Sequence, residues 1–330
     1  MNNIYLASVG TKSGKSVLSI GLAMNYPGKV GFYKPFRENT VNRGGKLMDQ
    51  DAVLLSEILG LEGSEKLSPF IYDIFDPVSL GDITASYKDL SKGKEFMIIE
   101  GSRDFSNGCA HGISHLDIAE ALGAPMVLVS SPAPQSLDAV FMFRHLCEER
   151  GIELKGAVIN KTAGPKEREF LEKKGITVLG EIPLIPELRA FRVSEITERL
   201  DANVIAGKAG MDNVVEEVIV GAMTPQVAVR YMRRAKKKAV ITGGDRTEIL
   251  LAALSTNTSC IIVTGGITPV RTVMSRADEL KVPILLTNED TLAAAEAIDH
   301  LIARIDPKDT EKLGLLKKEI RKGVDLNKIW

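Results

Sequence analysis

The segment Gly10-Thr11-Lys12-Ser13-Gly14-Lys15-Ser16 has the residue types and spacing of a phosphate-binding loop. Glycines let backbone N–H groups turn toward oxygen anions, and the start of the following helix adds partial positive charge. Lys15 would then place an ammonium on the β- and γ-phosphates of a nucleotide, and Ser16 a hydroxyl on Mg²⁺. Position 9 is Val where the general pattern has Gly, so the loop is irregular. The alternative is a glycine-rich turn with an incidental Gly-Lys-Ser.

Phosphoryl chemistry also needs carboxylates for the metal and often a second cation. Lys34 and Glu100 each directly follow an apolar run typical of a strand, and Asp51 stands at the start of a predicted helix. Because the carboxyl ends of parallel strands open on one crevice, these residues are predicted to share a site with Lys15. Taken singly, they have structural alternatives: a solvated strand end for Lys34, an N-cap for Asp51 and a loop acid for Glu100.

The elements that must position these residues follow from the alternation of short apolar runs with helical patterns, which predicts parallel βαβ units. The predicted strands cover residues 4–8, 29–33, 96–99, 125–129, 155–159 and 176–180, and the predicted helices residues 16–24, 51–59, 115–122 and 137–150. The strands are apolar throughout, as expected when helices cover both faces of a sheet. The fold class is therefore α/β, with a parallel sheet of the P-loop NTPase type.

A second, smaller α/β domain is predicted beyond a boundary near residues 207–210. Its strands are expected at 239–242, 260–264 and 283–286, with helices beginning near Asp245, Val270 and Glu289. The predicted organisation is a nucleotide-binding domain over 1–205, a second domain over 206–305 and a charged helical tail over 306–330.

The bulk properties exclude several classes of protein. The formal net charge is −1, which gives no global field to attract nucleic acid or an anionic membrane. Three widely spaced cysteines do not suggest a disulfide framework. No apolar run is long enough to span a bilayer, and the first residues lack the features of a signal peptide. A cytoplasmic location without nucleic-acid or membrane partners is expected.

In this order, the motifs resemble those of dethiobiotin synthetase. They are closer still to the dethiobiotin-synthetase-like domain that begins many long bacterial phosphate acetyltransferases, over about residues 1–205. The motifs are Gly10-Thr11…Gly14-Lys15-Ser16, Gly31-Phe32-Tyr33-Lys34-Pro35, Asp51-Ala52, Ile99-Glu100-Gly101 and Gly156-Ala157-Val158-Ile159-Asn160. The wider family includes cobyrinic acid amide synthases and partitioning ATPases.

The resemblance implies a role for each matching position. Lys15 and Ser16 match the phosphate-loop pair, and Lys34 matches the lysine that faces the substrate and the γ-phosphate. Asp51 and Glu100 match the carboxylates that complete the Mg²⁺ shell with Ser16. Asn160 matches the residue that reads the base, which favours adenine; a turn-forming Asn is the alternative. Thus ATP and Mg²⁺ are the implied cofactors, and a homodimer is the implied assembly.

The sequence also departs from dethiobiotin synthetase. After Gly101 the synthetase has a further glycine-rich segment, whereas Ser102-Arg103-Asp104-Phe105 follows here. The half of the site that binds the second substrate is therefore remodelled. ATP binding survives this change better than carboxylation of the synthetase's substrate does.

Two predicted strands of the second domain end in paired glycines, Gly243-Gly244 before Asp245-Arg246-Thr247 and Gly265-Gly266 after Thr264. Two such loops side by side predict an N–H-rich pocket for an anion or nucleotide effector at Gly243, Gly244, Asp245, Gly265 and Gly266. Asp245 is also predicted to cap its helix. This pattern is the signature of the DRTGG domain, which implies a regulatory or ligand-sensing role. The acetyltransferase domain of the long enzymes has no counterpart in these residues, so that activity is not expected.

Three functions remain open from the sequence. The first is a nucleotide-dependent regulatory or sensory protein. The second is an ATP-dependent ligase or synthetase of the dethiobiotin synthetase or cobyrinic acid amide synthase type, acting on a small carboxylate or amine. In that case Lys15 and Lys34 are the catalytic residues. The third is an assembly module that holds its nucleotide as a structural cofactor.

Overall fold

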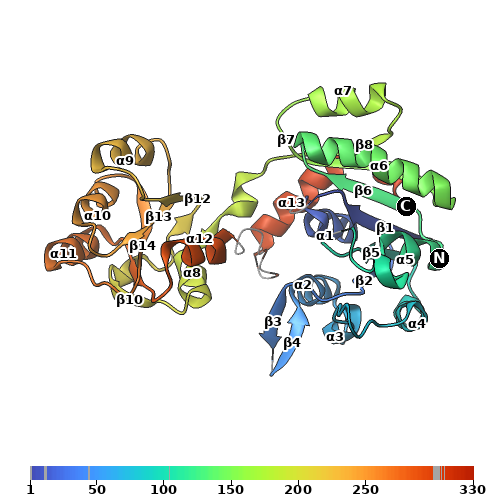
Figure 1. The fold of residues 1–330 in the computed structure, drawn as a ribbon, viewed down its shortest axis with the longest axis horizontal. Coiled ribbons are helices and arrows are strands. Elements are labelled where there is room, and N and C mark those ends of the chain that lie inside the picture. The colour runs from blue at the N-terminus through green and yellow to red at the C-terminus, as the bar shows by residue number, and fades with distance from the viewer. Residues whose placement is uncertain are drawn as a thin grey trace. The chain divides into compact units, whose positions relative to one another are not determined.

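A computed structural model describes residues 2–10, 13–43, 45–103, 105–299, 305, 307 and 309–330 of the chain (Figure 1). The chain forms two compact units, one of residues 1–184 and 305–330 and the other of residues 185–304. Thr11 and Lys12 of the predicted phosphate loop, and Asp104 of the remodelled segment, lie outside the described residues. No helix in the described part of the chain has the length and apolar character needed to cross a bilayer.

The first unit contains a six-stranded parallel sheet in the order β2-β5-β1-β6-β7-β8. Its strands are β1 (Asn2–Ser8), β2 (Val30–Tyr33), β5 (Phe96–Glu100), β6 (Met126–Ser130), β7 (Leu154–Thr162) and β8 (Val178–Pro183). Its α-helices are α1 (Lys15–Asn25), α2 (Gln50–Leu59), α3 (Ser64–Leu67), α4 (Leu80–Ser91), α5 (His115–Ala121), α6 (Pro134–Arg150), α7 (Lys166–Lys173) and α13 (Thr310–Gly323). A separate antiparallel hairpin pairs β3 (Thr40–Arg43) with β4 (Lys46–Asp49).

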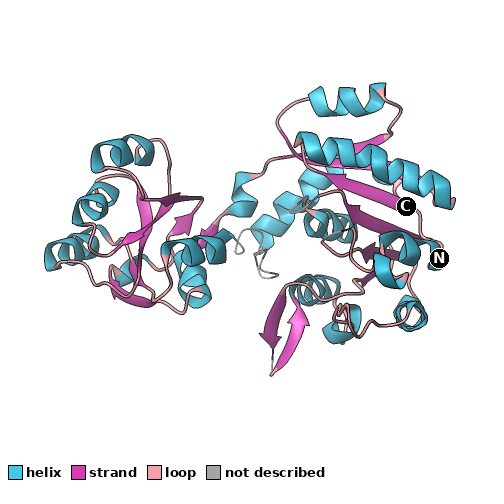
Figure 2. Cartoon of the chain, viewed as in Figure 1, coloured by secondary structure: helices cyan, strands magenta, loops and turns pink. Residues whose placement is uncertain are grey.

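Helices cover both faces of this sheet (Figure 2). On one face, strand residues such as Tyr5 pack with Ile83 of α4, Ile118 of α5 and Phe143 of α6 in one buried apolar cluster. The other face lies against α1 and α13. Strands β2, β5 and β6 are buried at every position, which accounts for their continuous apolar sequence. The predicted fold class is confirmed.

The C-terminal segment belongs to the first unit. Helix α13 packs on α1, and Ile320 fills the space above Gly21, where a Cβ would come 2.2 Å from the Ile320 Cγ1 atom. Val324 then pairs with Gly180, beside the edge strand β8. Trp330, the single tryptophan, packs edge-on against Tyr26. The segment predicted as a tail is therefore helical over Thr310–Gly323 and completes the core of the first unit.

The second unit has a five-stranded sheet in the order β10-β15-β14-β13-β12, parallel except for the β10–β15 pair. Its sheet strands are β10 (Asn203–Ala206), β12 (Glu217–Val220), β13 (Lys238–Gly243), β14 (Thr258–Thr264) and β15 (Ile284–Leu286). A small ladder joins β9 (Phe191–Arg192) to β11 (Val214–Val215), and the α-helices are α8 (Val193–Arg199), α9 (Pro225–Met232), α10 (Thr247–Leu254), α11 (Arg271–Leu280) and α12 (Thr291–Asp299).

The two units divide after Leu184, earlier than the boundary near 207–210 expected from the sequence. The reason is burial: Val193 and Ile196 of α8 pack in one apolar cluster with Ile241 of β13. Strand β10 also pairs with β15, so the residues just before 205 are part of the second unit's sheet.

Candidate nucleotide site and second-unit loops

The predicted phosphate loop connects β1 to α1, and its geometry depends on Gly14. Gly14 has a φ of 94°, in the left-handed region, and a Cβ there would lie 1.9 Å from the Asn160 Nδ2 atom. The Asn160 side chain is buried and donates from Nδ2 to the Ser13 carbonyl oxygen at 2.8 Å. The Ser13 hydroxyl in turn contacts the Ser8 hydroxyl at 2.5 Å. The end of β7 therefore braces the loop at the point where only glycine is tolerated.

Lys15 begins α1, and its side chain turns in toward the end of the sheet. Its Nζ atom donates to the main-chain oxygen of Ser102 at 2.7 Å, just beyond β5. Burial lowers the pKa of Lys15 from its usual value, and Glu100 opposes that shift. The Ser102 hydroxyl also contacts the Nε2 atom of buried His115 at 3.0 Å, so the lysine's acceptor lies in a well-packed turn.

Glu100, the last residue of β5, faces two hydroxyls of α1. Its Oε1 atom accepts from the Ser16 hydroxyl at 3.1 Å, and its Oε2 atom accepts from the Ser19 hydroxyl at 2.6 Å. Ser16 and Ser19 are three residues apart, so they lie on one face of the helix. Burial, together with the nearby charge of Asp51, raises the pKa of Glu100 to about 7.

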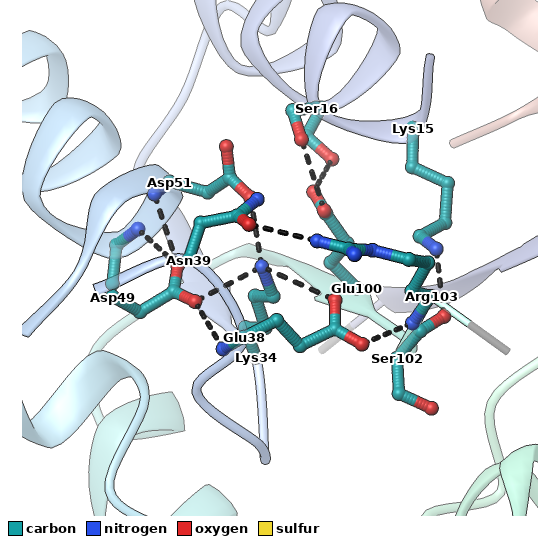
Figure 3. A network of polar contacts seen from close by, with 12 residues as sticks. Lys15, Ser16, Lys34, Glu38, Asn39, Asp49, Asp51, Glu100, Ser102 and Arg103 are labelled. Atoms are coloured by element: carbon teal, nitrogen blue, oxygen red, sulfur yellow. Dashed lines mark hydrogen bonds and ion pairs between the residues drawn. The ribbon is translucent and has the colours of Figure 1, made fainter. Parts of the chain in front are cut away.

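Lys34, which follows β2, is 1 % exposed and lies among carboxylates (Figure 3). Its Nζ atom is 2.7 Å from Asp51 Oδ2, 3.1 Å from Asp49 Oδ2 and 3.7 Å from Glu38 Oε2. Burial opposes the charge on Lys34, but attraction by Asp51 and Asp49 outweighs it and raises the pKa of the lysine. In the same way, burial opposes ionisation of Asp51, and Lys34 overcomes it and lowers the pKa of that carboxyl.

The structure thus brings the predicted residues Lys15, Ser16, Lys34, Asp51 and Glu100 together at the carboxyl edge of one sheet. Strands β2, β5 and β1 are adjacent in that sheet, and the residues that follow them meet there. Asp51 of α2 also hydrogen-bonds the side chain of Ser16 in α1, so these side chains link the two helices.

A segment beyond β2 connects to the turn after β5. The Arg103 main-chain N–H donates to a carboxylate oxygen of Glu38, and its guanidinium donates to the Asn39 side-chain oxygen at 2.7 Å. Figure 3 shows these three residues beside Lys34. The residues that replace the expected glycine-rich segment therefore contribute contacts to the cluster.

In the second unit, the two glycine-pair loops close on one another. A Cβ at Gly244 would lie 1.7 Å from the Ile267 carbonyl oxygen, so the loops are in direct backbone contact. The N–H groups of Gly265 and Gly266 donate to the main-chain oxygens of Glu289 and Thr287. Because these two N–H groups are already bonded, the prediction that Gly265 and Gly266 offer free N–H groups to an anion is wrong, whereas an effector site at Gly243, Gly244 and Asp245 stays a prediction.

Asp245 was predicted to cap the following helix, and this is also wrong. Helix α10 begins at Thr247, with Arg246 at the N-cap position and no side-chain cap hydrogen bond. Asp245 is exposed, and it is its main-chain oxygen that accepts from the Thr247 N–H. The helix begins two residues later than the sequence pattern indicates, because the backbone of Arg246 is not helical, with φ −85° and ψ 60°.

The Arg246 guanidinium donates to the main-chain oxygens of Gly221 and Met223, the latter at 2.8 Å. We expect Arg246→Ala and Arg246→Lys both to reduce the stability of the second unit by about 2 kcal/mol, because a lysine cannot reproduce the forked pair of donors. Hydrogen exchange of the β13 amides measures this, with the exposed Arg276→Ala as the control. Unchanged exchange in both Arg246 variants would contradict it.

Comparison with known proteins places these sites in a family. Residues 2–192 match the profile of an AAA domain, which is more than half of the chain. The chain belongs to this AAA-domain family. Residues 195–301 match the profile of the DRTGG domain. The first unit is therefore a P-loop AAA domain, and the second is a DRTGG domain.

Relatives of the AAA and DRTGG pair include a phosphate acetyltransferase from Nitratidesulfovibrio vulgaris, which is 25% identical and matches 99% of this chain but 51% of its own length. The ATP-dependent dethiobiotin synthetase BioD of Bacillus velezensis is 26% identical and covers 60% of this chain and 94% of its own. The chain thus spans about half the length of the phosphate acetyltransferase. A ParA family ATPase from Chlorobium tepidum matches with a TM-score of 0.41 and 15% identity, over 57% of this chain and 86% of its own.

The donor set of the AAA domain suits a Mg²⁺ ion. The Ser16 hydroxyl and the carboxylates of Glu100 and Asp51 are hard oxygen donors, and Ser16 interacts with both carboxylates. Within the described ranges, no group of three or more His, Cys, Asp and Glu side chains is arranged to hold a metal by itself. That is compatible with Mg²⁺, which usually takes one or two carboxylates together with substrate phosphates.

Four residues of the AAA domain that contact the cluster were not predicted from the sequence: Asp49, Ser19, Ser102 and Glu38. Two of them carried a usable signal. Asp49 lies two residues before the predicted helix, and Asp is a favoured residue type at a helix N-terminus; Ser19 follows Ser16 by three residues on the same helix face. Ser102 and Glu38 carried none, because their roles depend on how a turn and a connecting segment fold over the sheet.

Proposed function

We propose that the chain is an ATP- and Mg²⁺-binding regulatory protein, in which the AAA domain binds the nucleotide and the DRTGG domain senses a small ligand. The supporting observation is the cluster at the carboxyl edge of the sheet, where Lys15, Ser16 and Glu100 meet. Lys15 would contact the phosphates, and Ser16, Asp51 and Glu100 would hold the metal. When bound, Mg²⁺ supplies charge neutralisation for the phosphates.

Calorimetric titration with ATP and Mg²⁺ tests this proposal. We expect binding by the wild type and a loss of at least about 100-fold in affinity for Lys15→Met, because a buried ammonium aimed at phosphates is removed. Lys173→Met on the exposed surface of α7 is the control and should bind like the wild type. Absence of binding by the wild type at millimolar ATP would end the proposal.

Asn160 is proposed to contact the adenine base in addition to bracing the loop through Ser13. Competition between ATP and GTP tests this. The chain is further proposed to act as a homodimer in the cytoplasm. Sedimentation velocity would then give twice the 35.8 kDa mass of one chain.

A second candidate function is an ATP-dependent ligase that acts on a small carboxylate or amine. It is supported by Lys34, which lies beside Asp51 at the same edge as Lys15 and which a ligand sensor does not obviously require. In this function, Lys34 would hold an oxygen of the acceptor during phosphoryl transfer. Release of ADP that is stimulated by a panel of small amines and carboxylates would support the ligase. Lack of stimulation by every member of the panel would favour the regulator.

A further inference from the structure

Asp49 is a buried acid, 1 % exposed, whose two oxygens have separate partners. Its Oδ1 atom accepts from the main-chain N–H groups of Asp51 and Ala52 at 2.9 and 3.1 Å, and thereby caps α2. Its Oδ2 atom lies 3.1 Å from Lys34 Nζ and accepts from the Glu38 N–H at 3.0 Å. The Oδ1 atom of Asp49 therefore caps α2, and its Oδ2 atom holds Lys34 in position.

Asp51 contacts a different set of groups. Its Oδ2 atom lies on Lys34 at 2.7 Å, and its carboxylate also bonds the Ser16 side chain. If Asp51 helps to hold Mg²⁺, its carboxylate is shared between the metal and Lys34. The lysine then needs another partner to keep its position.

Among the described acids near Lys34, Asp49 is the best placed to be that partner. Glu38 is more distant at 3.7 Å, and it also accepts the main-chain N–H of Arg103. Glu100 is committed to the hydroxyls of α1. The cap on α2 holds Asp49 itself in place, so its Oδ2 atom is a fixed point.

We propose that Asp49 is a positioning residue that holds Lys34 toward the terminal phosphate of bound ATP while Asp51 serves the metal. This inference rests on the proposed function. It adds a pair of residues, Asp49 and Lys34, that would distinguish a bound triphosphate from a diphosphate. Asp49 acts only through Lys34 and touches neither nucleotide nor metal. It should therefore affect the preference for ATP over ADP and leave ADP binding unchanged.

Asp49→Asn separates the two roles, because an Asn oxygen retains the helix cap while its amide group replaces the oxygen that faces Lys34. Calorimetry would give the affinities for ATP and ADP, each with Mg²⁺ and with EDTA. We expect Asp49→Asn to lower the ATP/ADP affinity ratio about tenfold both with Mg²⁺ and with EDTA, and to leave the ADP affinity unchanged. The matched variant Asp51→Asn should instead lose most of the Mg²⁺ dependence.

Repeating the measurement in a second variant separates the proposed effect of Asp49 from a general loss of folded structure. In Lys34→Met, adding Asp49→Asn should not change the ATP/ADP ratio further, because its route of action is gone. An unchanged ratio in Asp49→Asn would overturn the inference, as would equal losses of ATP and ADP affinity, which would reduce Asp49 to a helix cap. If the wild type binds neither nucleotide, the proposed function itself fails and the inference fails with it.

Discussion

Glu100→Gln is expected to abolish the Mg²⁺ dependence of ATP binding and to stabilise the nucleotide-free chain above neutral pH. Loss of a carboxylate that is proposed to hold the metal should lower the affinity for ATP in Mg²⁺ by at least about 100-fold, since even outer partners of a metal site are worth 10- to 100-fold. Affinity measured in EDTA should change much less. The amide keeps an acceptor for a hydroxyl of α1 but cannot neutralise a cation.

The stability effect follows from the pKa of Glu100, which burial and Asp51 raise from 4.5 to about 7. Between these two pH values, the folded chain holds a proton that the unfolded chain has released. The contribution of this proton to the free energy of unfolding is therefore complete below pH 4.5 and is lost as pH rises through 7, by about 3 kcal/mol. Glu100→Gln has no such proton, so its stability relative to the wild type should grow by that amount over the same window.

Trp330 makes this measurable, because the single tryptophan packs against Phe96 and Tyr26 of the nucleotide-binding unit. Urea titrations followed by tryptophan fluorescence at pH 5 and pH 8 give the free energy of unfolding of that unit. Glu95→Gln, an exposed acid just before β5, is the control and should follow the wild type at both pH values. Parallel pH profiles for Glu100→Gln and the wild type would show that Glu100 is ionised throughout.

The residues at the carboxyl edge of the first sheet could be predicted because their chemistry and their strand positions agree. Lys34 and Glu100 directly follow apolar runs that could only be buried parallel strands, and Lys15 follows a glycine-rich turn after another. Parallel strands open on a common edge, so chain order alone was enough to bring these three side chains together.

Asp49 could not be predicted in the same way, because its place depends on an element the sequence hid. No strand was predicted in the stretch that leads to it, but most of that stretch forms the hairpin of β3 and β4. That hairpin has little apolar alternation, so period-two patterning is absent. The return of α13 to the first unit was hidden for a related reason: its buried Leu313, Leu316 and Ile320 are spaced among many charges.

The prediction of free N–H groups at Gly265 and Gly266 of the DRTGG domain was wrong for a physical reason that concerns glycine itself. A glycine pair after a strand predicts free N–H groups only if the loop stays open. At Gly244 the missing side chain serves instead to let the Ile267 carbonyl approach. The sequence alone cannot distinguish a glycine whose backbone contacts a ligand from one whose backbone contacts a neighbouring loop.

Lys34→Met is expected to destabilise the nucleotide-binding unit by about 3–5 kcal/mol, because removal of one partner leaves buried charges uncompensated. Asp49 and Asp51 would then face each other without the ammonium that now lies 3.1 and 2.7 Å from them. Urea titration followed through Trp330 measures the loss. Lys29→Met, at an exposed position just before β2, is the control and should cost little.

The triple variant Lys34→Met/Asp49→Asn/Asp51→Asn should recover most of this loss, because it removes the charges that the lysine balanced. Lys34→Met alone should also become more stable as the pH falls from 7 to 5. Two acids that share a buried site raise the pKa of one of them, and the folded state then binds the extra proton. A loss below about 1 kcal/mol for Lys34→Met, or no recovery in the triple variant, would show that water already screens this cluster. The expected result instead identifies Lys34 as the internal cation of the site. In the free protein, Lys34 neutralises carboxylates, and one of these, Asp51, is proposed to hold the metal.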